Sequence, residues 1–257
     1  ASFGHNTVIF HIPIFHVRMS FRNKPDMPQF VKPTSPPKTN YIRMVEQSDA
    51  LESKRRTIIS KLLSKILRHQ AVNEGYAIDK DGYIFIEELL KSNKFKSLKT
   101  TKQDIFDVVA NDNKNRFELS ALEDKIRAVQ GHSIKTLDAN KILTKITAEN
   151  LTLLPNYNEK EYFIIHGTST KNYNSILESQ LLKKMDRTHV HFTFEMPDDN
   201  TTVVSGYRNS SKILIFIELH KLMEDDELKN CIHLSKNNVI LVSKDIPTSF
   251  IDHILEK

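Results

Sequence analysis

Cysteine, glycine and tryptophan are scarce in this chain, and long apolar runs are absent. The 257 residues contain one cysteine, Cys231, which excludes an internal disulfide and any zinc or iron–sulfur site built from several cysteines. No stretch approaches the ~18 uninterrupted apolar residues that a membrane-spanning helix needs. We therefore expect a soluble, intracellular protein, cytoplasmic or nuclear and not secreted, with one or two domains of roughly 100–200 residues each.

Two common classes of nucleotide site are also missing from the sequence. It has neither the GxxxxGK[ST] pattern of a P-loop nor the GxGxxG pattern of a Rossmann fold. The stretch DKDGYIFIEE has the composition of a calcium loop, but its glycine falls at the fourth position and not at the sixth. These three ways of binding a nucleotide or a calcium ion are therefore excluded.

The formal net charge of +5 comes from one end of the chain. Residues 1–56 hold nine Lys or Arg and four Asp or Glu, whereas the remaining residues carry 28 of each sign. Within that remainder, residues 57–150 hold 16 basic and 13 acidic side chains, and residues 151–257 hold 12 and 15. Because a tail accounts for the excess, the charge alone does not indicate a nucleic-acid-binding protein. Any contacts with nucleic acid must be few and local.

Composition and periodicity divide the chain into three segments, and the predicted fold class is α+β. Residues 1–55 include six of the nine prolines, which predicts a disordered, Pro-rich, basic tail without a catalytic role. Residues 56–150 combine helices with β-hairpins, as a small module of winged-helix type does. Periodicity breaks between Ala148 and Tyr157. Residues 155–257 then predict a compact domain built mostly of strands.

Several local signals in the first half predict its elements. Apolar residues recur at three- and four-residue intervals in TIISKLLSKILRHQ, which predicts an amphipathic helix from Thr57. The stretch GYAIDKDGYIFIEELL predicts a strand, a tight turn at Asp81–Gly82, a second strand and the start of a helix. Thr101, with Asp104 three residues later, predicts a capping box. NKNRFELSA and KIRAVQGHS predict a strand–turn–strand unit.

The second half is rich in β-branched residues. Strands are predicted for EYFIIHGT, HVHFTF, KILIFIEL and NNVILVS, and a short helix is predicted for NYNSILESQLL. Neither a heptad repeat nor a self-complementary edge is apparent, so we expect a monomer.

Clusters of polar residues interrupt these elements, and each has a structural as well as a functional interpretation. Arg68–His69 ends the first helix, where cations also complement the helix dipole. Arg127 precedes a turn at Gln130–Ser133, and Arg208 lies in a loop that follows Ser205. Hairpin geometry and an exposed loop are the simpler explanations for these two. Three of the six glycines fall in QGHS, HGT and SGYR, which indicates that a ligand approaches the backbone closely there.

Histidines form a further cluster, in HGT at His166–Thr168 and at His189 and His191. Histidines at positions i and i+2 of a strand face the same side, as metal ligands do. No cysteine lies nearby and no carboxylate has a matching spacing, so metal is the weaker interpretation. Structural histidines are the default for each motif alone.

Taken together, these motifs resemble the tRNA 2′-phosphotransferase family. The matching stretches, in order along residues 58–250, are SKLLSKILRH, GYIFIEELL, RFEL, IRAVQGHSIK, IHGTS, ILESQLL, MDRTHVHF, VSGYR, ILIFIEL and NNVILVS. Each is short, but ten of them in the same order and spacing are not a chance match. The resemblance implies a winged-helix-like N-terminal lobe and an ADP-ribosyltransferase-like C-terminal lobe that binds NAD⁺.

The resemblance also implies a reaction. Enzymes of this family remove the internal 2′-phosphate that remains at a splice junction of tRNA, which is the final step of tRNA splicing. The phosphate attacks the nicotinamide ribose of NAD⁺ and expels nicotinamide, which gives an ADP-ribosylated 2′-phospho-RNA. The ribose 2″-hydroxyl then attacks phosphorus, which releases 2′-OH RNA and ADP-ribose 1″,2″-cyclic phosphate. No metal is required.

The resemblance carries over to named residues. Those that match the catalytic arginine–histidine set are Arg68, His69, Arg127 and Arg208. Those expected to line the NAD⁺ pocket are His166, Gly167, Thr168, Arg187, His189 and Ser205. Arginine suits a phosphate because its forked guanidinium holds two oxygens at once. SGYR departs from the family pattern at Tyr207, where methionine is common, and keeps its size and apolar character.

Two other functions stay open. A protein or nucleic-acid ADP-ribosyltransferase would stop after the transfer step, and such enzymes often use a late glutamate that has no convincing counterpart here. A non-enzymatic winged-helix RNA- or DNA-binding protein would carry a strong basic stripe. Residues 57–150 exceed neutrality by only three charges, 16 basic against 13 acidic.

Overall fold

The structure is a computed structural model that describes residues 38–196 and 205–257. Contacts divide the chain into two compact units, Ala1–Val45 and Glu46–Lys257. The second unit contains two large hydrophobic cores, one built from residues Ile59 to Ile134 and the other from residues Ile146 to Ile246. We refer to the parts around these cores as the N-terminal lobe and the C-terminal lobe.

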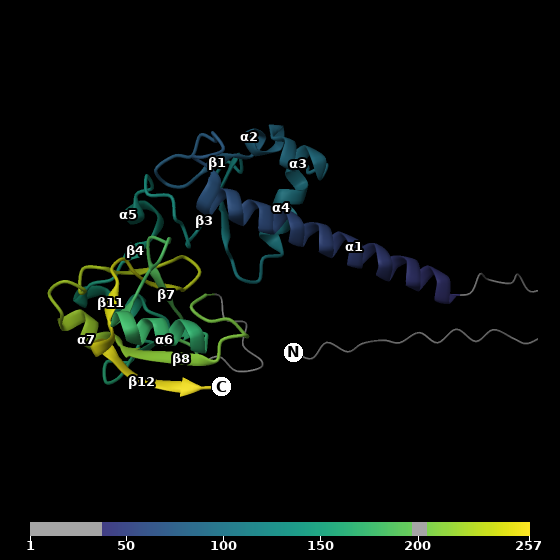
Figure 1. Ribbon diagram of the computed structural model, residues 1–257. Coiled ribbons are helices and arrows are strands. Elements are labelled where there is room, and N and C mark those ends of the chain that lie inside the picture. Colours follow the sequence, from purple (N-terminus) through teal and green to yellow (C-terminus); the bar gives the residue numbers. More distant parts are fainter. Residues whose placement is uncertain (1–37, 197–204) are drawn as a thin grey trace, which may run out of the picture. The chain divides into compact units, whose positions relative to one another are not determined.

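The N-terminal lobe consists of short helices and a small sheet around the end of a long helix (Figure 1). Its helices are α1 (Lys38–Lys65), a π-helical turn (Ile66–Gln70), α2 (Ile86–Lys91), α3 (Asn93–Ser97) and α4 (Lys102–Ala110). Its strands are β1 (Ile84–Phe85), β2 (Phe117–Leu119) and β3 (Lys125–Ala128). They form an antiparallel sheet in the order β1-β3-β2.

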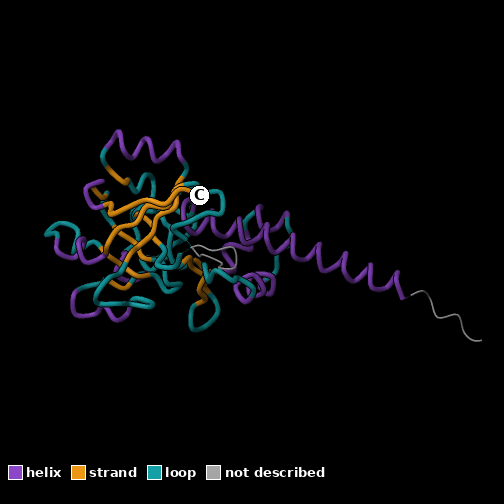
Figure 2. The backbone as a smooth tube through the Cα atoms, turned by 90° about the horizontal axis from the view of Figure 1, so that it is seen from below, coloured by secondary structure: helices purple, strands orange, loops and turns teal. Residues whose placement is uncertain are grey.

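The C-terminal lobe is built mainly from short strands, drawn in orange in Figure 2. Its strands are β4 (Thr144–Lys145), β5 (Phe163–Thr168), β6 (Leu181–Leu182), β7 (Val190–Phe192), β8 (Ile213–Glu218), β9 (Ile232–Leu234), β10 (Ile240–Val242), β11 (Ile246–Pro247) and β12 (Ile251–Glu256). Its helices are α5 (Ala139–Ile142), α6 (Thr170–Ser179), α7 (Leu219–Glu224) and two 3₁₀ segments (Ala148–Leu153, Thr248–Phe250). The three sheets have the strand orders β4-β9-β10-β7, β12-β8-β5 and β11-β6.

This arrangement confirms an α+β fold, and most of the local predictions hold. The periodic helix is present, and Ile59, Leu63 and Ile66 are fully buried on its inner face. The capping box at Thr101 is confirmed, because Thr101 Oγ1 accepts from Asp104 N at 3.1 Å and Asp104 Oδ2 accepts from Thr101 N at 2.7 Å. The glycine turn is confirmed as well, since Gly82 has a φ of +82°.

Two elements differ from the prediction. α1 begins at Lys38, so residues 38–55 of the predicted tail are helical and not disordered. No proline or glycine follows Pro37 until Gly75, and nothing interrupts the helix. The earlier tail lies outside the described residues. The predicted strand before Asp81 is also missing, because Ala77 N donates to Glu88 Oε1 instead of joining a ladder.

The C-terminal lobe begins earlier in the chain than the break in periodicity between Ala148 and Tyr157 suggests. β4 pairs with β9, and Ile146 is fully buried in the core of the C-terminal lobe. A third, small cluster joins Ile142 and Leu143 to Val239 and Leu241. The segment from residue 142 onward therefore packs with the later strands and links the lobes.

Candidate active site

The π-helical turn that ends α1 carries Arg68 and His69. The backbone oxygen of Arg68 accepts from Ser133 N at 2.9 Å. The Arg68 side chain lies against Gly131, where a Cβ would come within 3.4 Å of Arg68 Nε. Nε and Nη2 of Arg68 are buried without a hydrogen-bond partner among the described residues. Arg68 therefore offers two N–H donors that a bound acceptor can use.

Arginines crowd around this side chain. Burial, then the charges of Arg116 and Arg187, lower the pKa of Arg68 to about 10, and Asp112 acts in the opposite direction. The pKa of Arg187 is lowered too, first by desolvation and then by the charge of Arg208. Like charges that lower each other's pKa repel one another, and an anion bound among them relieves that repulsion. The cluster is therefore suited to phosphate groups.

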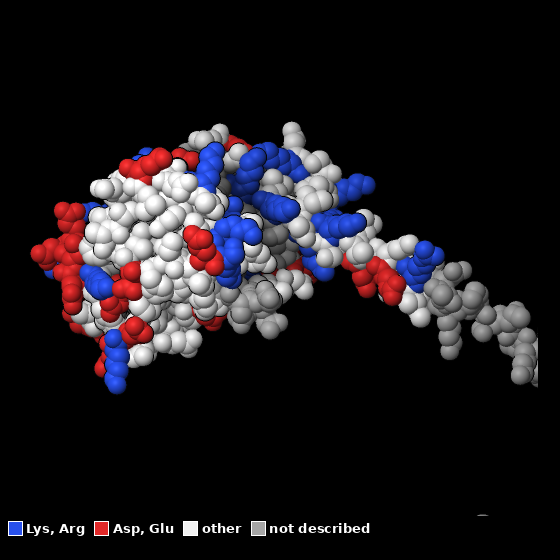
Figure 3. Space-filling view, turned by 60° about the horizontal axis from the view of Figure 1, so that its bottom comes forward, with Lys and Arg blue, Asp and Glu red and all other residues white. Residues whose placement is uncertain are grey.

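Charges are unevenly distributed on the face of the second unit that Figure 3 shows. In the space-filling view of Figure 3, acidic side chains gather at the left edge, which belongs to the C-terminal lobe, and basic side chains lie nearer to α1. An anionic ligand is therefore attracted to one part of the surface and not to all of it.

His69 stands beside the arginine cluster. Its Nδ1 lies 3.0 Å from Ser133 Oγ, which fixes the orientation of the exposed ring. Burial, followed by the charges of Arg187 and Arg68, lowers the pKa of His69. The imidazole is therefore neutral near pH 7 and able to accept a proton.

Polar contacts between the lobes bring two of the sequence motifs together. Thr188 donates to the backbone oxygen of His132 through N at 3.0 Å and through Oγ1 at 3.1 Å. His191 Nε2 lies 3.0 Å from Gln130 Oε1. The Nε2 atoms of His132 and His189 are buried and have no partner among the described residues. The QGHS turn and the THVH strand thus form two adjoining walls of one site.

The remaining predicted NAD⁺-site residues lie at the end of β5 and after it. His166 Nδ1 donates to the backbone oxygen of His191 at 3.0 Å, and burial and Arg187 lower the pKa of His166. Thr168 is buried, and its backbone oxygen accepts from Lys212 N. Ser205 lines a cavity of about 180 Å³ together with Asn115 from the N-terminal lobe.

Two of the three motif glycines, Gly167 and Gly206, serve protein packing, which differs from the predicted close approach of a ligand. A Cβ on Gly206 would lie 2.5 Å from Thr193 N, and one on Gly167 would lie 2.7 Å from Tyr207 Cδ2. At Gly131 the neighbour is Arg68. Protein atoms therefore occupy the space of the missing side chains at Gly167 and Gly206, whereas glycine at Gly131 is favoured by its φ of +88°.

The structure places Arg127 apart from the arginine cluster. Its Nε donates to Glu118 Oε2 at 2.8 Å, and Nη1 donates to the backbone oxygen of Asp81 at 3.0 Å. Its guanidinium lies 4.6 Å from the centre of the Tyr83 ring, and the residue is 5% exposed. These are the contacts of a structural arginine, and the predicted catalytic role of Arg127 finds no geometric support.

Arg116, and not Arg127, is the arginine of the N-terminal lobe that lies near Arg68. Arg116 forms an ion pair with Asp112, and its charge is the largest electrostatic contribution that lowers the pKa of Arg68. The signal was present in RFEL, one of the matching stretches, in which Arg116 directly precedes a buried phenylalanine. Sequence spacing alone does not show that Arg127 is held by Glu118 and backbone oxygens, nor that Arg116 lies near Arg68 while it pairs with Asp112.

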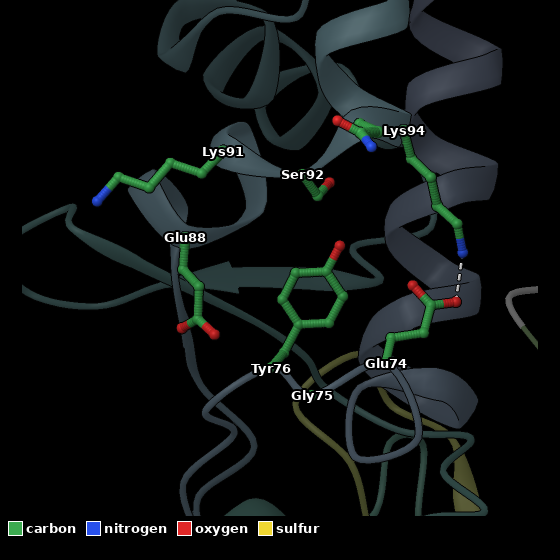
Figure 4. A pocket seen from close by; sticks show the side chains of 8 residues that line it. Glu74, Gly75, Tyr76, Glu88, Lys91, Ser92 and Lys94 are labelled. Carbon is green, nitrogen blue, oxygen red and sulfur yellow. Dashed lines mark hydrogen bonds and ion pairs between the residues drawn. The ribbon is translucent and has the colours of Figure 1, made fainter.

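A larger pocket, of about 380 Å³, lies elsewhere on the N-terminal lobe (Figure 4). The Tyr76 ring stands in the middle of it, and Lys94 reaches across to pair with Glu74. Two glutamates and two lysines balance its charge, and it contains none of the predicted site residues. Within residues 38–196 and 205–257, no three His, Cys, Asp or Glu side chains gather as metal ligands. In the same part of the chain, no helix is both long and apolar enough to cross a membrane.

Comparison with known proteins identifies the family. Residues 54–244 match the model of the RNA 2′-phosphotransferase, Tpt1/KptA family. A tRNA 2′-phosphotransferase of Saccharomyces cerevisiae is 38% identical over 220 residues, which cover 84% of this chain and 89% of that protein. tRNA 2′-phosphotransferase 1 of Danio rerio is 34% identical over 198 residues, or 76% of this chain and 81% of that protein. A probable RNA 2′-phosphotransferase of Pectobacterium atrosepticum is 32% identical over 77% of this chain and 98% of its own length.

The family match covers most of both lobes, including the π-helical turn, the QGHS turn and the loop of Arg208. All three lie within residues 54–244. The chain is therefore a transferase and belongs to the RNA 2′-phosphotransferase, Tpt1/KptA family.

Proposed function

We propose that this enzyme transfers the splice-junction 2′-phosphate of tRNA to NAD⁺, as the final step of tRNA splicing. The products are 2′-OH RNA, nicotinamide and ADP-ribose 1″,2″-cyclic phosphate. In this proposal the N-terminal lobe is winged-helix-like and contributes to RNA binding, and the C-terminal lobe is ADP-ribosyltransferase-like. The protein acts as a monomer in the cytoplasm or nucleus and uses no metal.

One observation carries the proposal. Arg68 keeps two buried N–H groups without a partner among the described residues, and its neighbours are the cationic side chains of Arg116 and Arg187. Asp112 is the carboxylate whose charge raises the pKa of Arg68 against these effects. Buried donors and repelling cations are costly unless an anion binds among them. A 2′-phosphate supplies both the charge and the oxygens.

The NAD⁺ site is proposed at the β5 end, with His166, Gly167, Thr168, Arg187, His189 and Ser205 around it. Arg187 and the unpartnered His189 Nε2 offer polar contacts to a dinucleotide, whose pyrophosphate is anionic. His189 and Ser205 belong to segments that also form the inter-lobe contacts and the 180 Å³ cavity. Phosphate and dinucleotide would then meet where the lobes join.

The proposed roles follow from what each step needs. A phosphomonoester is largely dianionic at pH 7, since its second pKa is about 6, so its attack on the ribose requires positioning more than a base. Arg68, Arg116 and Arg208 would hold the phosphate oxygens in line. The second step places charge on the same oxygens, where preorganised guanidinium groups stabilise the transition state. Neutral His69, oriented by Ser133, would move a proton between hydroxyl groups.

The test uses a short RNA with one internal 2′-phosphate, incubated with the protein in the presence and absence of NAD⁺. RNA and nucleotide products are followed by mass. We expect NAD⁺-dependent loss of the phosphate and the appearance of ADP-ribose cyclic phosphate. Arg68→Ala and Arg208→Ala should each abolish the reaction. Arg56→Ala, which removes a guanidinium about 18 Å away along α1, is the matched control and should retain it.

The other outcomes separate the alternatives. An ADP-ribosylated RNA that persists would indicate an ADP-ribosyltransferase without the second step. Salt-sensitive RNA binding without turnover, indifferent to the 2′-phosphate, would indicate a binding protein and overturn the proposal.

A further inference from the structure

A buried asparagine of the C-terminal lobe reaches the loop that carries Arg116. Asn237, in the turn between β9 and β10, is 6% exposed, and its Nδ2 donates to the backbone oxygen of Lys114 at 2.9 Å. Its Oδ1 accepts from Ser235 Oγ at 2.7 Å. Because the Ser235 hydroxyl donates to the amide oxygen of Asn237, the NH₂ group of Asn237 is held toward Lys114. This bond joins residues 123 positions apart in the sequence.

The receiving loop depends on such support. Asn115, between Lys114 and Arg116, has a φ of +44°, a left-handed conformation that is uncommon for non-glycine residues and that asparagine adopts more readily than most. Conformations of this kind persist where the surroundings fix them. Asp112 fixes the loop from within, because it accepts from Arg116 N at 2.5 Å and pairs with the Arg116 guanidinium. Asn237 fixes it from the other lobe.

A second contact shows that the β9–β10 turn docks along this whole edge. Lys236, next to Asn237, forms an ion pair with Glu118 on β2. Asn115 and Asn237 also line the same small cavity. The turn therefore contacts the N-terminal lobe on both sides of Arg116, and Asn237 is one of its buried residues.

We propose that Asn237 is a positioning residue for Arg116. It holds the backbone of the 112–116 loop so that the Arg116 guanidinium stays beside Arg68, and it does not itself contact the ligand. The fit between the lobes thereby becomes a condition for phosphate recognition. This inference rests on the proposed function, in which Arg116 contacts the 2′-phosphate.

Asn237→Asp keeps the size of asparagine, removes the NH₂ donor and adds a negative charge, which the control variant Asn150→Asp adds as well. The first readout is the affinity ratio between a 2′-phosphorylated RNA and the same RNA with a 2′-hydroxyl. We expect the ratio to fall about tenfold or more, with the affinity for the 2′-hydroxyl RNA unchanged. The second readout is amide hydrogen exchange over residues 112–119, which should become faster in the variant.

A double-mutant cycle distinguishes positioning from general loosening of the fold. If Asn237 acts through Arg116, Asn237→Asp should lower the ratio no further once Arg116→Lys is in place. Asn150→Asp is the matched control, because Asn150 Nδ2 donates to the backbone oxygen of Lys145 at 3.0 Å in the same manner. It should leave both the ratio and the exchange of residues 112–119 unchanged.

Each failure has its own signature. Additive losses in the double variant, or an unchanged ratio and unchanged exchange in Asn237→Asp, would overturn the positioning role. A wild-type protein without preference for the 2′-phosphate would instead overturn the proposed function. The exchange measurement then still decides whether Asn237 holds the loop.

Discussion

At the scale of the residue, the surroundings of an arginine determine what its charge can do. The N–H groups of Arg127 donate to Glu118 and to backbone oxygens, and Glu118 neutralises its positive charge inside the N-terminal lobe. Arg68 has buried donors left over, and its strongest electrostatic neighbour, Arg116, is also cationic. The first kind of arginine stabilises the fold, and the second kind gains stability when an anion binds.

This division predicts opposite phenotypes for Arg127 and Arg116. Arg127→Ala removes a buried guanidinium from its pair with the half-buried Glu118 and should lower the free energy of unfolding by about 2 kcal/mol, which corresponds to a Tm lower by roughly 4–8 °C. Arg116→Lys keeps the positive charge and loses the forked guanidinium group that can hold two phosphate oxygens. Phosphate transfer should therefore fall by about tenfold or more, with little change in Tm. Thermal unfolding and single-turnover rates check both. A stable but inactive Arg127→Ala would contradict the assignment.

His69 carries the second prediction at this scale. His69→Ala should slow the second step by about 10² or more, the range of general acid–base catalysis, so that ADP-ribosylated RNA accumulates. The pKa of His69 is below its ordinary value, so the neutral ring persists below pH 6.5. The single-turnover rate of the wild type should stay level from pH 7.5 to 6.5 and decline at lower pH. Wild-type rates in His69→Ala would exclude this role.

At the scale of the element, short loops are locked by glycines that other segments touch. The loop that leads to Arg208 packs its Gly206 on the backbone of Phe192 and Thr193, at distances that no Cβ tolerates. β7 and this loop therefore move as one piece. Gly75, in contrast, has a similar φ of +78° and nothing within 4 Å of the missing Cβ.

These two glycines form a matched pair for a prediction. Gly75→Ala meets only the conformational cost of a positive φ, about 1 kcal/mol. Gly206→Ala meets the same cost and a backbone clash, so it should destabilise the protein by a further 1–3 kcal/mol or so and displace Arg208. Chemical denaturation measures the difference, and the phosphate-transfer rate should fall in Gly206→Ala alone. Equal stability losses in the two variants would refute the packing argument.

At this scale the sequence predicts elements that depend on neighbouring residues, and it does not predict features that depend on distant contacts. The helix of Ile59 and Leu63, the capping box at Thr101 and the strand through Ile215 rest on periodicity or on neighbouring residues, and all are present. The missing strand before Asp81 and the roles of Arg116 and Arg127 depend on partners far away in the sequence. Motif spacing locates Arg116 and Arg127 in the chain, but it does not show which side chains they contact in the fold.

At the scale of the whole molecule, the two lobes are joined by buried polar groups as well as by apolar packing. Gln130, His132, His189 and His191 are at most 6% exposed, and all lie in the two segments that meet between the lobes. Burial, followed by the charges of Arg68 and Arg187, lowers the pKa of His132 and His191, so these rings are neutral in the folded protein. The junction on which the proposed site depends is therefore sensitive to acid.

This sensitivity gives a prediction with a definite sign. Burial, followed by nearby cations, lowers the pKa of His132 to about 3 and that of His189 to about 4. Both values lie below the unfolded value of about 6.5, so between these limits the unfolded chain binds more protons than the folded one. The stability that the neutral rings contribute is complete above pH 6.5 and is lost as the pH falls toward the folded values.

At pH 5 the loss should amount to roughly 2 kcal/mol for each of these two histidines, and the Tm should lie about 10 °C below its value at pH 7. His132→Gln and His189→Gln remove the titrating groups, so each should flatten the dependence of Tm on pH even if it lowers Tm at pH 7. His253→Gln, an exposed histidine on β12, is the control and should leave the slope unchanged. A wild-type Tm that is constant from pH 7 to 5 would mean that the junction accommodates the charged rings. The charged rings would then leave intact the other polar contacts between the lobes, such as the Asn237 bond to Lys114.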